Sequence, residues 1–145
     1  MTTEEKDLLL KDLCGRLPHG VKCQVQEDEF TYIGTLCRIE VDGKNGNLLD
    51  FAESISGLDC QVYLSEVKPY LFPLSSITLE QRCKVSYIIP EISIAEQKII
   101  FYDNGGSVKL EQLDKLFNFF NLHHIDWRGL IPMGLANDAT GLNIY

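Results

Sequence analysis

The chain has 145 residues, of which 45% are hydrophobic and 23% are charged. This length and balance are typical of one domain with a hydrophobic core and exclude global disorder. No stretch approaches the 18 or more apolar residues that a membrane span needs, and the acidic start lacks the basic and apolar regions of a signal peptide. We therefore expect a single domain, residues 1–145, without a membrane partner, located in the cytoplasm.

The net charge is −8, from 13 Lys and Arg against 21 Asp and Glu. Most of the acidic excess lies in residues 1–60, which hold 6 basic and 12 acidic residues. No segment offers the cluster of Lys and Arg that binding to phosphates requires. The charge therefore disfavours nucleic acid as a partner. It fits either simple solubility or attraction to a basic partner protein.

Residues 1–17 are predicted to form a helix. Thr2 and Glu5 have the spacing of a capping box. An apolar stripe with spacing i, i+3, i+4 and i+7 follows, formed by Leu10, Leu13, Cys14 and Leu17. We expect this stripe to dock on a sheet.

Residues 20–64 are predicted to be rich in β-strands. Gly20–Gln26 alternates apolar and polar residues, and Asn47–Phe51 and Asp59–Leu64 read as two further strands. Asp42 to Gly46 is a strong turn signal. In the longest strand, Thr31–Val41, we expect one face to carry Ile33, Thr35, Cys37, Ile39 and Val41.

Residues 65–106 have a mixed pattern. Pro69 and Pro73 exclude a helix around them and are expected to close the sheet region. Thr78 and Gln81 again have capping-box spacing. Residues 78–100 remain ambiguous, because a helix to about Tyr87 and a strand over Val85–Ile89 fit equally well. Lys98–Tyr102 is predicted to be a strand.

Residues 107–145 are predicted to form a helix and an irregular tail. Ser107 is the expected cap, and the helix should run to about His123. Its apolar face is expected to contain Leu110, Leu113, Leu116, Phe117 and Phe120. The predicted fold class is therefore α+β, with a small antiparallel sheet or partial barrel flanked by an N-terminal helix and a C-terminal helical segment.

The five cysteines are widely and irregularly spaced, and no C-x-x-C motif is present. An odd number at such spacing is not typical of a disulfide framework. In a cytosolic protein we expect them to act as small buried hydrophobic side chains.

Catalytic and metal-binding motifs are not recognisable in the sequence. His123 and His124 are adjacent, and consecutive helix residues point about 100° apart, whereas two ligands on one helix need i, i+3 or i, i+4 spacing. We therefore assign no catalytic residue, no metal site and no cofactor. A small enzyme that uses one of these histidines or a cysteine beside a carboxylate stays an alternative.

Two groups of residues are candidates for ligand binding. The first brings the only tryptophan together with residue types that form binding hot spots: His123, His124, Asp126, Trp127 and Arg128. The same residues could instead form a packing joint, with Asp126 capping a turn. The second is a helix N-terminus that could bind an anion, at Gly105, Gly106 and Ser107, or simply a loop with a helix cap.

Three segments resemble small uncharacterised proteins of gut Bacteroidetes and their phages. They are residues 10–21, residues 67–78 and the tail from Phe120, where His123 to Leu130 is similar to the family's "HHFDYRGLI". Phe72 stands where the family usually has a basic residue. The resemblance implies a phage or prophage accessory protein made in a bacterial host cell, and it carries over no catalytic residue.

The leading hypothesis from the sequence is a non-enzymatic phage or prophage accessory binding protein. Its target is a host protein or a small ligand, and one specific version is counter-defence through sequestration of a small nucleotide signal. The alternatives are a protein–protein inhibitor that acts through an acidic surface, a structural phage component, and the small enzyme described above. Homo-oligomeric assembly leaves no motif in the sequence and stays open.

Overall fold

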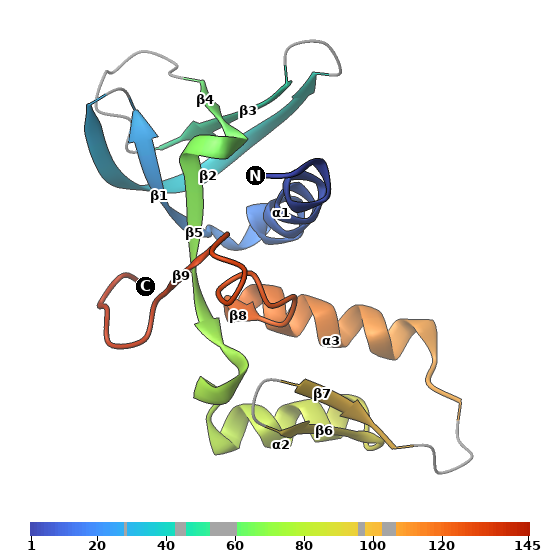
Figure 1. The fold of residues 1–145 in the computed structure, drawn as a ribbon. Helices are drawn as coiled ribbons and strands as arrows, with labels where there is room; N and C mark the ends of the chain where they lie inside the picture. The colour runs from blue at the N-terminus through green and yellow to red at the C-terminus, as the bar shows by residue number, and fades with distance from the viewer. Residues whose placement is uncertain (28, 43–45, 53–60, 96–97, 103–106) are drawn as a thin grey trace.

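The computed structural model describes residues 1–27, 29–42, 46–52, 61–95, 98–102 and 107–145. It confirms the α+β class, with helices on a mixed sheet that does not close (Figure 1). No helix in these ranges is both long enough and apolar enough to cross a membrane. Two sequence predictions, the turn around residues 43–45 and the ligand candidates Gly105 and Gly106, lie outside the described residues.

The main sheet has the strand order β4-β3-β2-β1-β5-β8, and β9 also pairs with β5. Strands β1 to β5 pair antiparallel, as expected, but β8 and β9 pair in parallel with β5. These two strands have two residues each, too few to show alternation in the sequence. The strands are β1 (Lys22–Glu27), β2 (Phe30–Asp42), β3 (Gly46–Phe51), β4 (Val62–Tyr63), β5 (Val67–Pro73), β8 (Ile125–Asp126) and β9 (Asn137–Asp138).

Strand β5 runs through the middle of the molecule (Figure 1). Its first half pairs with β1, and its second half pairs with β9 and then β8. The prediction that these prolines close the sheet region is therefore wrong for Pro69, which lies inside the strand, whereas Pro73 is the last residue of β5. Proline fits here because β5 changes partners along its length, so that not every backbone N–H must face a neighbouring strand.

Strand β2 contains a register shift between Leu36 and Arg38. Before the shift the buried positions are Gly34 and Leu36, whereas Ile33 is 45% exposed. Of the residues predicted to share one face, Ile39 packs against the core, whereas Cys37 and Val41 are exposed like Ile33. A Cβ added at Gly34 would lie 3.0 Å from the Cβ of Phe51, so this core-facing position requires glycine. A pattern of apolar side chains does not mark a glycine as a core position.

The helices are α1 (Thr3–Arg16), α2 (Leu79–Ile88) and α3 (Leu110–Leu122). Both predicted capping boxes are present, at Thr2 with Glu5 and at Thr78 with Gln81. The prediction that Ser107 caps the last helix is wrong, because α3 begins after Lys109, whose backbone N–H donates to the Gln112 side chain.

In the ambiguous segment the helix alternative is confirmed, and the strand over Val85–Ile89 is wrong, because Val85 to Ile88 lie in α2. Helix α2 is followed by two antiparallel strands, β6 (Ile92–Ala95) and β7 (Lys98–Phe101), which form a separate small sheet. Short 3-10 turns occupy Leu17–His19, Leu64–Glu66 and Leu74–Ser76. The tail, predicted to be irregular, contains β9 and is otherwise built of turns and irregular backbone.

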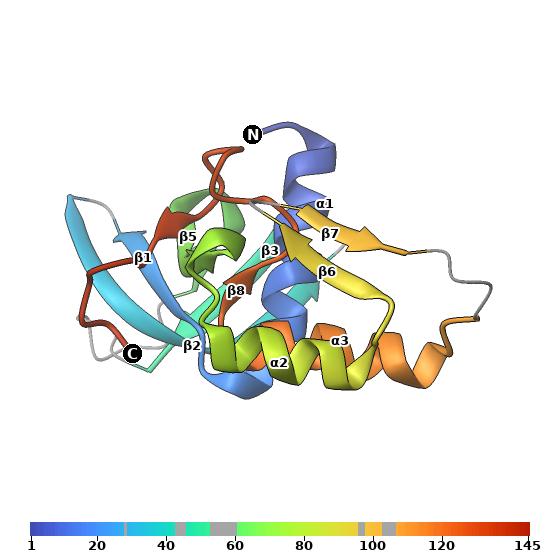
Figure 2. The same cartoon turned by 90° about the horizontal axis from the view of Figure 1, so that it is seen from below.

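Buried apolar side chains form two clusters. The first packs α1 against the curved sheet, and the second lies among α2, α3 and β6 (Figure 2). Cys23 belongs to the first cluster, but Cys14, Cys37 and Cys83 are exposed. The expectation of buried cysteines therefore holds for one of the four that the structure describes.

Candidate functional site

The buried face of α1 contains an ion pair that the apolar pattern did not predict. Its buried residues are Leu9, Asp12, Leu13 and Arg16, whereas Cys14 is exposed. The helix is thus rotated from the predicted stripe. An apolar pattern does not reveal this pair, although Asp12 and Arg16 have the i, i+4 spacing of an ion pair on one helix face.

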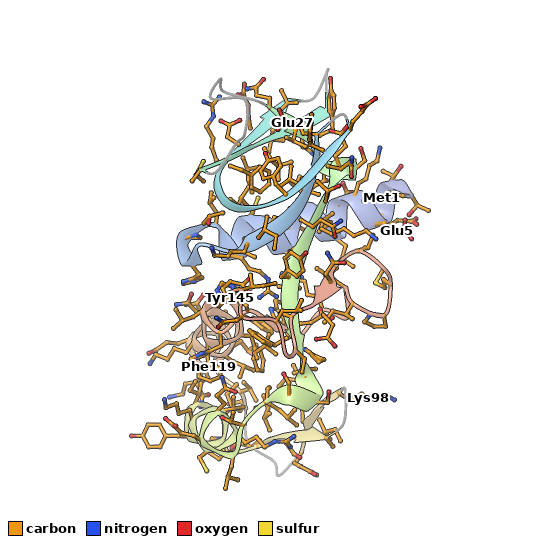
Figure 3. All side chains as sticks on the ribbon, turned by 90° about the vertical axis from the view of Figure 1, so that its left-hand side faces the viewer. Met1, Glu5, Glu27, Lys98, Phe119 and Tyr145 are labelled. Carbon is orange, nitrogen blue, oxygen red and sulfur yellow. The ribbon has the colours of Figure 1, made fainter. Side chains whose placement is uncertain are left out.

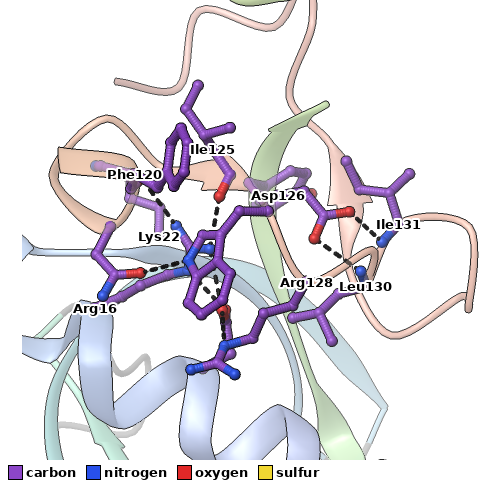
Figure 4. Close-up of polar contacts among 12 residues, drawn as sticks. Arg16, Lys22, Phe120, Ile125, Asp126, Arg128, Leu130 and Ile131 are labelled. Carbon is purple, nitrogen blue, oxygen red and sulfur yellow. Dashed lines mark hydrogen bonds and ion pairs between the residues drawn. The ribbon is translucent and has the colours of Figure 1, made fainter. Parts of the chain in front are cut away.

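Arg16 joins α1 to the C-terminal half of the chain (Figure 4). Its Nε and Nη2 donate to the two carboxylate oxygens of Asp12 at 2.6 and 3.0 Å. Nη2 also donates to the carbonyl oxygen of Ile125 at 2.8 Å, and Nη1 donates to that of Phe120 at 3.5 Å. Since the side chains of the pair are fully buried, these bonds satisfy charges that water cannot reach.

Asp126 and Trp127 also make internal contacts. The carboxylate of Asp126 accepts the backbone N–H groups of Leu130 and Ile131, both at 2.8 Å, and so fixes the turn that follows β8 (Figure 4). The indole of Trp127 stacks on Phe117 at 4.4 Å between ring centroids. Its Nε1 donates to Asn121 at 3.0 Å.

Arg128 lies between Trp127 and α1. Its guanidinium carbon is 4.0 Å from the centroid of the indole ring, in a cation–π contact. Its Nε lies 3.3 Å from a carboxylate oxygen of Asp12, as an ion pair without the alignment of a hydrogen bond. Asp126, Trp127 and Arg128 thus form the packing joint that was the alternative reading of this cluster.

A cavity of about 530 Å³ lies where three parts of the chain meet: the end of β5 with the start of α2, the end of α3, and the C-terminal tail. Both histidines of the candidate cluster line it, and Asp126, Trp127 and Arg128 do not. The ring side chains around it are Phe72, His123, His124 and Tyr145. The polar side chains around it are Ser76, Thr78, Gln81 and Thr140.

His124 has a left-handed backbone, with φ of 53°, which directs the chain from α3 into β8. Its imidazole stacks on Tyr145 with centroids 4.0 Å apart and planes 13° from parallel. The Tyr145 hydroxyl donates to the carbonyl oxygen of Tyr70 at 2.7 Å and accepts the Lys22 N–H at 3.2 Å. Strands β1 and β5 therefore hold one wall of the cavity.

The cavity has little positive charge. Burial, and after it the nearby charge of Arg16, lowers the pKa of His124 to about 4. Burial and then the charge of Lys84 lower the pKa of His123. Both imidazoles are therefore neutral at pH 7, and no Lys or Arg is found among the described residues that line the cavity.

Asp126 lines a second, smaller cavity of about 310 Å³ together with Pro73, Gly129 and Pro132. Its carboxylate is already engaged by two backbone N–H groups, so this cavity presents no unsatisfied charge. Within the described ranges, no three His, Cys, Asp or Glu side chains are grouped so that they could hold a metal ion.

The predicted site residues that the structure describes lie in three different places. His123 and His124 reach the cavity, Asp126 to Arg128 form the joint, and Ser107 is an exposed residue ahead of α3. Sequence reasoning missed Phe72, Thr140 and Tyr145, because no spacing links residues so far apart in the chain. No protein family, curated protein or solved structure matches this chain.

Proposed function

We propose that the chain is a non-enzymatic binding protein, of the phage accessory type that the resemblance suggests, which holds a small planar ligand in the cavity beside His124. The observation that carries this proposal is the cavity itself. Its volume of about 530 Å³ falls in the range of small-molecule sites, and it lies between separate structural elements, where such sites are common.

The lining favours a ring that can both stack and form hydrogen bonds. The side chains of Phe72, His123 and Tyr145 supply ring surfaces. Thr78 and Gln81 are held in place by their capping box, in which the Gln81 side-chain oxygen accepts the Thr78 N–H. The Gln81 amide nitrogen adds two donors, and the Thr140 hydroxyl can donate or accept.

The charge of the residues that line the cavity restricts the class of ligand further. A phosphate group prefers Arg or Lys partners, and the described lining residues include neither. The neutral imidazoles do not replace them. The ligand class that fits is therefore a nucleobase, a nucleoside or a similar neutral heterocycle. The sequence hypothesis named a charged nucleotide as the sequestered ligand, and the proposal replaces it with this neutral class.

Isothermal titration calorimetry with the four ribonucleosides and their 5′-monophosphates tests the proposal. We expect at least one nucleoside to bind, and its monophosphate to bind more weakly. Replacing Thr140 at the cavity wall by tryptophan should abolish binding by filling the space. Met133→Trp, on an exposed turn outside the cavity, is the matched control and should bind like the parent.

Two results would contradict the proposal. One is that none of the nucleosides or monophosphates binds. The other is that a nucleoside binds Thr140→Trp as tightly as the parent, because the ligand would then lie elsewhere on the protein.

A further inference from the structure

The side chain of Arg82 connects the first turn of α2 to strand β6. Its Nη1 donates to the carbonyl oxygen of Ile94 at 2.6 Å, and its Nε donates to that of Ile77, just before the helix, at 3.4 Å. Nη2 carries two further N–H groups and has no hydrogen-bond partner in the described part of the chain. The guanidinium is therefore held in place by neutral groups that leave its charge uncompensated.

Arg82 differs in this respect from the other three arginines of the chain, each of which is paired with a carboxylate. The carboxylates are those of Asp12 for Arg16 and Arg128, and of Glu40 and Asp50 for Arg38. Among the residues that the structure describes, none forms an ion pair with Arg82. Because a charge that is partly removed from water is costly without a counter-ion, this half-buried guanidinium favours an anion from outside the chain.

Arg82 also lines a cavity of about 220 Å³ between α2 and β6, which lie side by side (Figure 1). Two hydroxyl groups join it there, from Ser86 one turn further along α2 and from Ser93 on β6. The described residues that line the cavity include no carboxylate. At ~30 Å³ for each water molecule, the space equals roughly seven waters, which is enough for one oxyanion but too little for a whole nucleotide.

We propose that this cavity binds a phosphate group, either as inorganic phosphate or at the end of a small phosphate monoester. Arg82 supplies the positive charge, and the hydroxyls of Ser86 and Ser93 supply further donors. A tetrahedral oxyanion presents oxygen atoms in several directions, so it suits donors that come from both a helix and a strand. A planar carboxylate can engage the guanidinium but not donors on several sides at once.

This site is separate from the larger cavity of the proposed function, and the two share no described lining residue. Figure 3 shows Lys98, of the hairpin that contains β6, toward one end of the molecule, and Tyr145, at the larger cavity, between Lys98 and Glu27. A nucleoside lacks a phosphate group, so calorimetry with nucleosides tests the larger cavity alone. The outcome at either site therefore does not decide the other.

A titration of the ¹⁵N-labelled protein with sodium phosphate at pH 7, followed by NMR, tests the proposal. Sodium chloride holds the ionic strength constant, so that general screening does not change. We expect saturable shifts of the Ser86, Ser93 and Ile94 amides in the millimolar range, and little shift with acetate. Glycerol 3-phosphate in place of phosphate shows which source is preferred, because the tighter ligand saturates first. Shifts that do not saturate with either phosphate compound, or an equal response to acetate, would overturn the proposal.

Ser86→Glu tests the role of the uncompensated charge. It places a carboxylate at i, i+4 from Arg82 and so supplies a counter-ion from within the chain. Since Ser86 is exposed and both carbonyl bonds of Arg82 remain, the fold should persist, which circular dichroism can verify. We expect this variant to lose the saturable phosphate shifts.

Ser65→Glu is the matched control, because it adds the same charge at another exposed serine. Ser65 lies in the 3-10 turn between β4 and β5, where the neighbouring Leu64 packs in the first cluster. This variant should bind phosphate like the parent. Phosphate binding that persists unchanged in Ser86→Glu, or that is lost equally in Ser65→Glu, would show that the cavity at Arg82 is not the site.

Discussion

His124 combines a left-handed backbone, a stacked ring and a buried side chain in one residue. Burial, together with the charges of Arg16, His19 and His123, lowers the pKa of its imidazole to about 4. In the unfolded chain the pKa returns to about 6.5. The residue therefore links the stability of the cavity wall to pH.

The direction of this link follows from proton uptake. Below about pH 6.5 the unfolded state binds a proton at His124, whereas the folded state binds one only near pH 4. The free energy of unfolding should therefore fall as the pH drops through this window. Asparagine tolerates the left-handed backbone and does not titrate in this range. In His124→Asn the fall in the free energy of unfolding that is due to His124 should therefore be absent. Urea unfolding of both proteins at a series of pH values measures the difference.

Tyr145→Phe is the control for this experiment, because it keeps the stacked ring and removes only the hydroxyl bonded to Tyr70. It should reduce stability by about 0.5–1.5 kcal/mol and leave the pH profile unchanged in shape. Parallel profiles for the parent and His124→Asn would show that the buried imidazole does not contribute to the pH dependence.

The candidate site was predictable only in part at the level of single residues. His123 and His124 stand out in the sequence because they lie beside Asp126, the only tryptophan and Arg128. Only the fold reveals that the two histidines point to a cavity while their neighbours pack inside. Tyr145 carried no signal, since its partners Lys22 and Tyr70 are 123 and 75 residues away.

At the scale of elements, the guanidinium of Arg16 links α1 to both α3 and β8. Arg16 bonds to Asp12 in its own helix and to the carbonyl oxygens of Phe120 and Ile125. A second guanidinium, that of Arg128, also approaches Asp12. Removing the carboxylate would leave a fully buried positive charge without its counter-ion.

Asp12→Ala should therefore destabilise the protein by about 3–5 kcal/mol, the cost typical of breaking a buried pair by removing one partner. Urea unfolding at pH 7 measures this change. Glu111→Ala, which breaks the fully exposed pair with Lys115, is the matched control and should produce no measurable change. If Asp12→Ala unfolds at the same urea concentration as the control, the buried pair is not what stabilises the joint.

Some elements are determined by residues close in sequence, and others by contacts with distant parts of the chain. Helix α1 was predictable because its capping box at Thr2 and its apolar spacing are local. The capping box at Thr78 marks the start of α2, but the sequence left helix and strand equally open for the residues after it. Strand β5 was not predictable, since its two prolines argue locally against a strand and only its successive partners permit one. The parallel strands β8 and β9 depend entirely on tertiary contacts with β5.

At the scale of the whole molecule, the two apolar clusters share structural parts. Val67 and Leu71 of β5 belong to the first cluster, while Phe72 packs against the second. Arg16 extends from α1, on the first cluster, to Phe120 and Ile125 in the second. Neither cluster can open without exposing groups that the other helps to bury, so we expect them to unfold together.

Fluorescence and hydrogen exchange can test this cooperativity. The only tryptophan, Trp127, packs against the second cluster, so its fluorescence should follow the same urea transition as the circular dichroism of the whole chain. Amides of α3 and of the β1–β2 hairpin should likewise exchange with the same opening free energy. A lower free energy for α3 would mean that the second cluster opens alone. In Arg16→Met, which removes a buried polar link between the clusters, we expect exchange of α3 to become faster than that of the hairpin, because fewer contacts then join the two clusters.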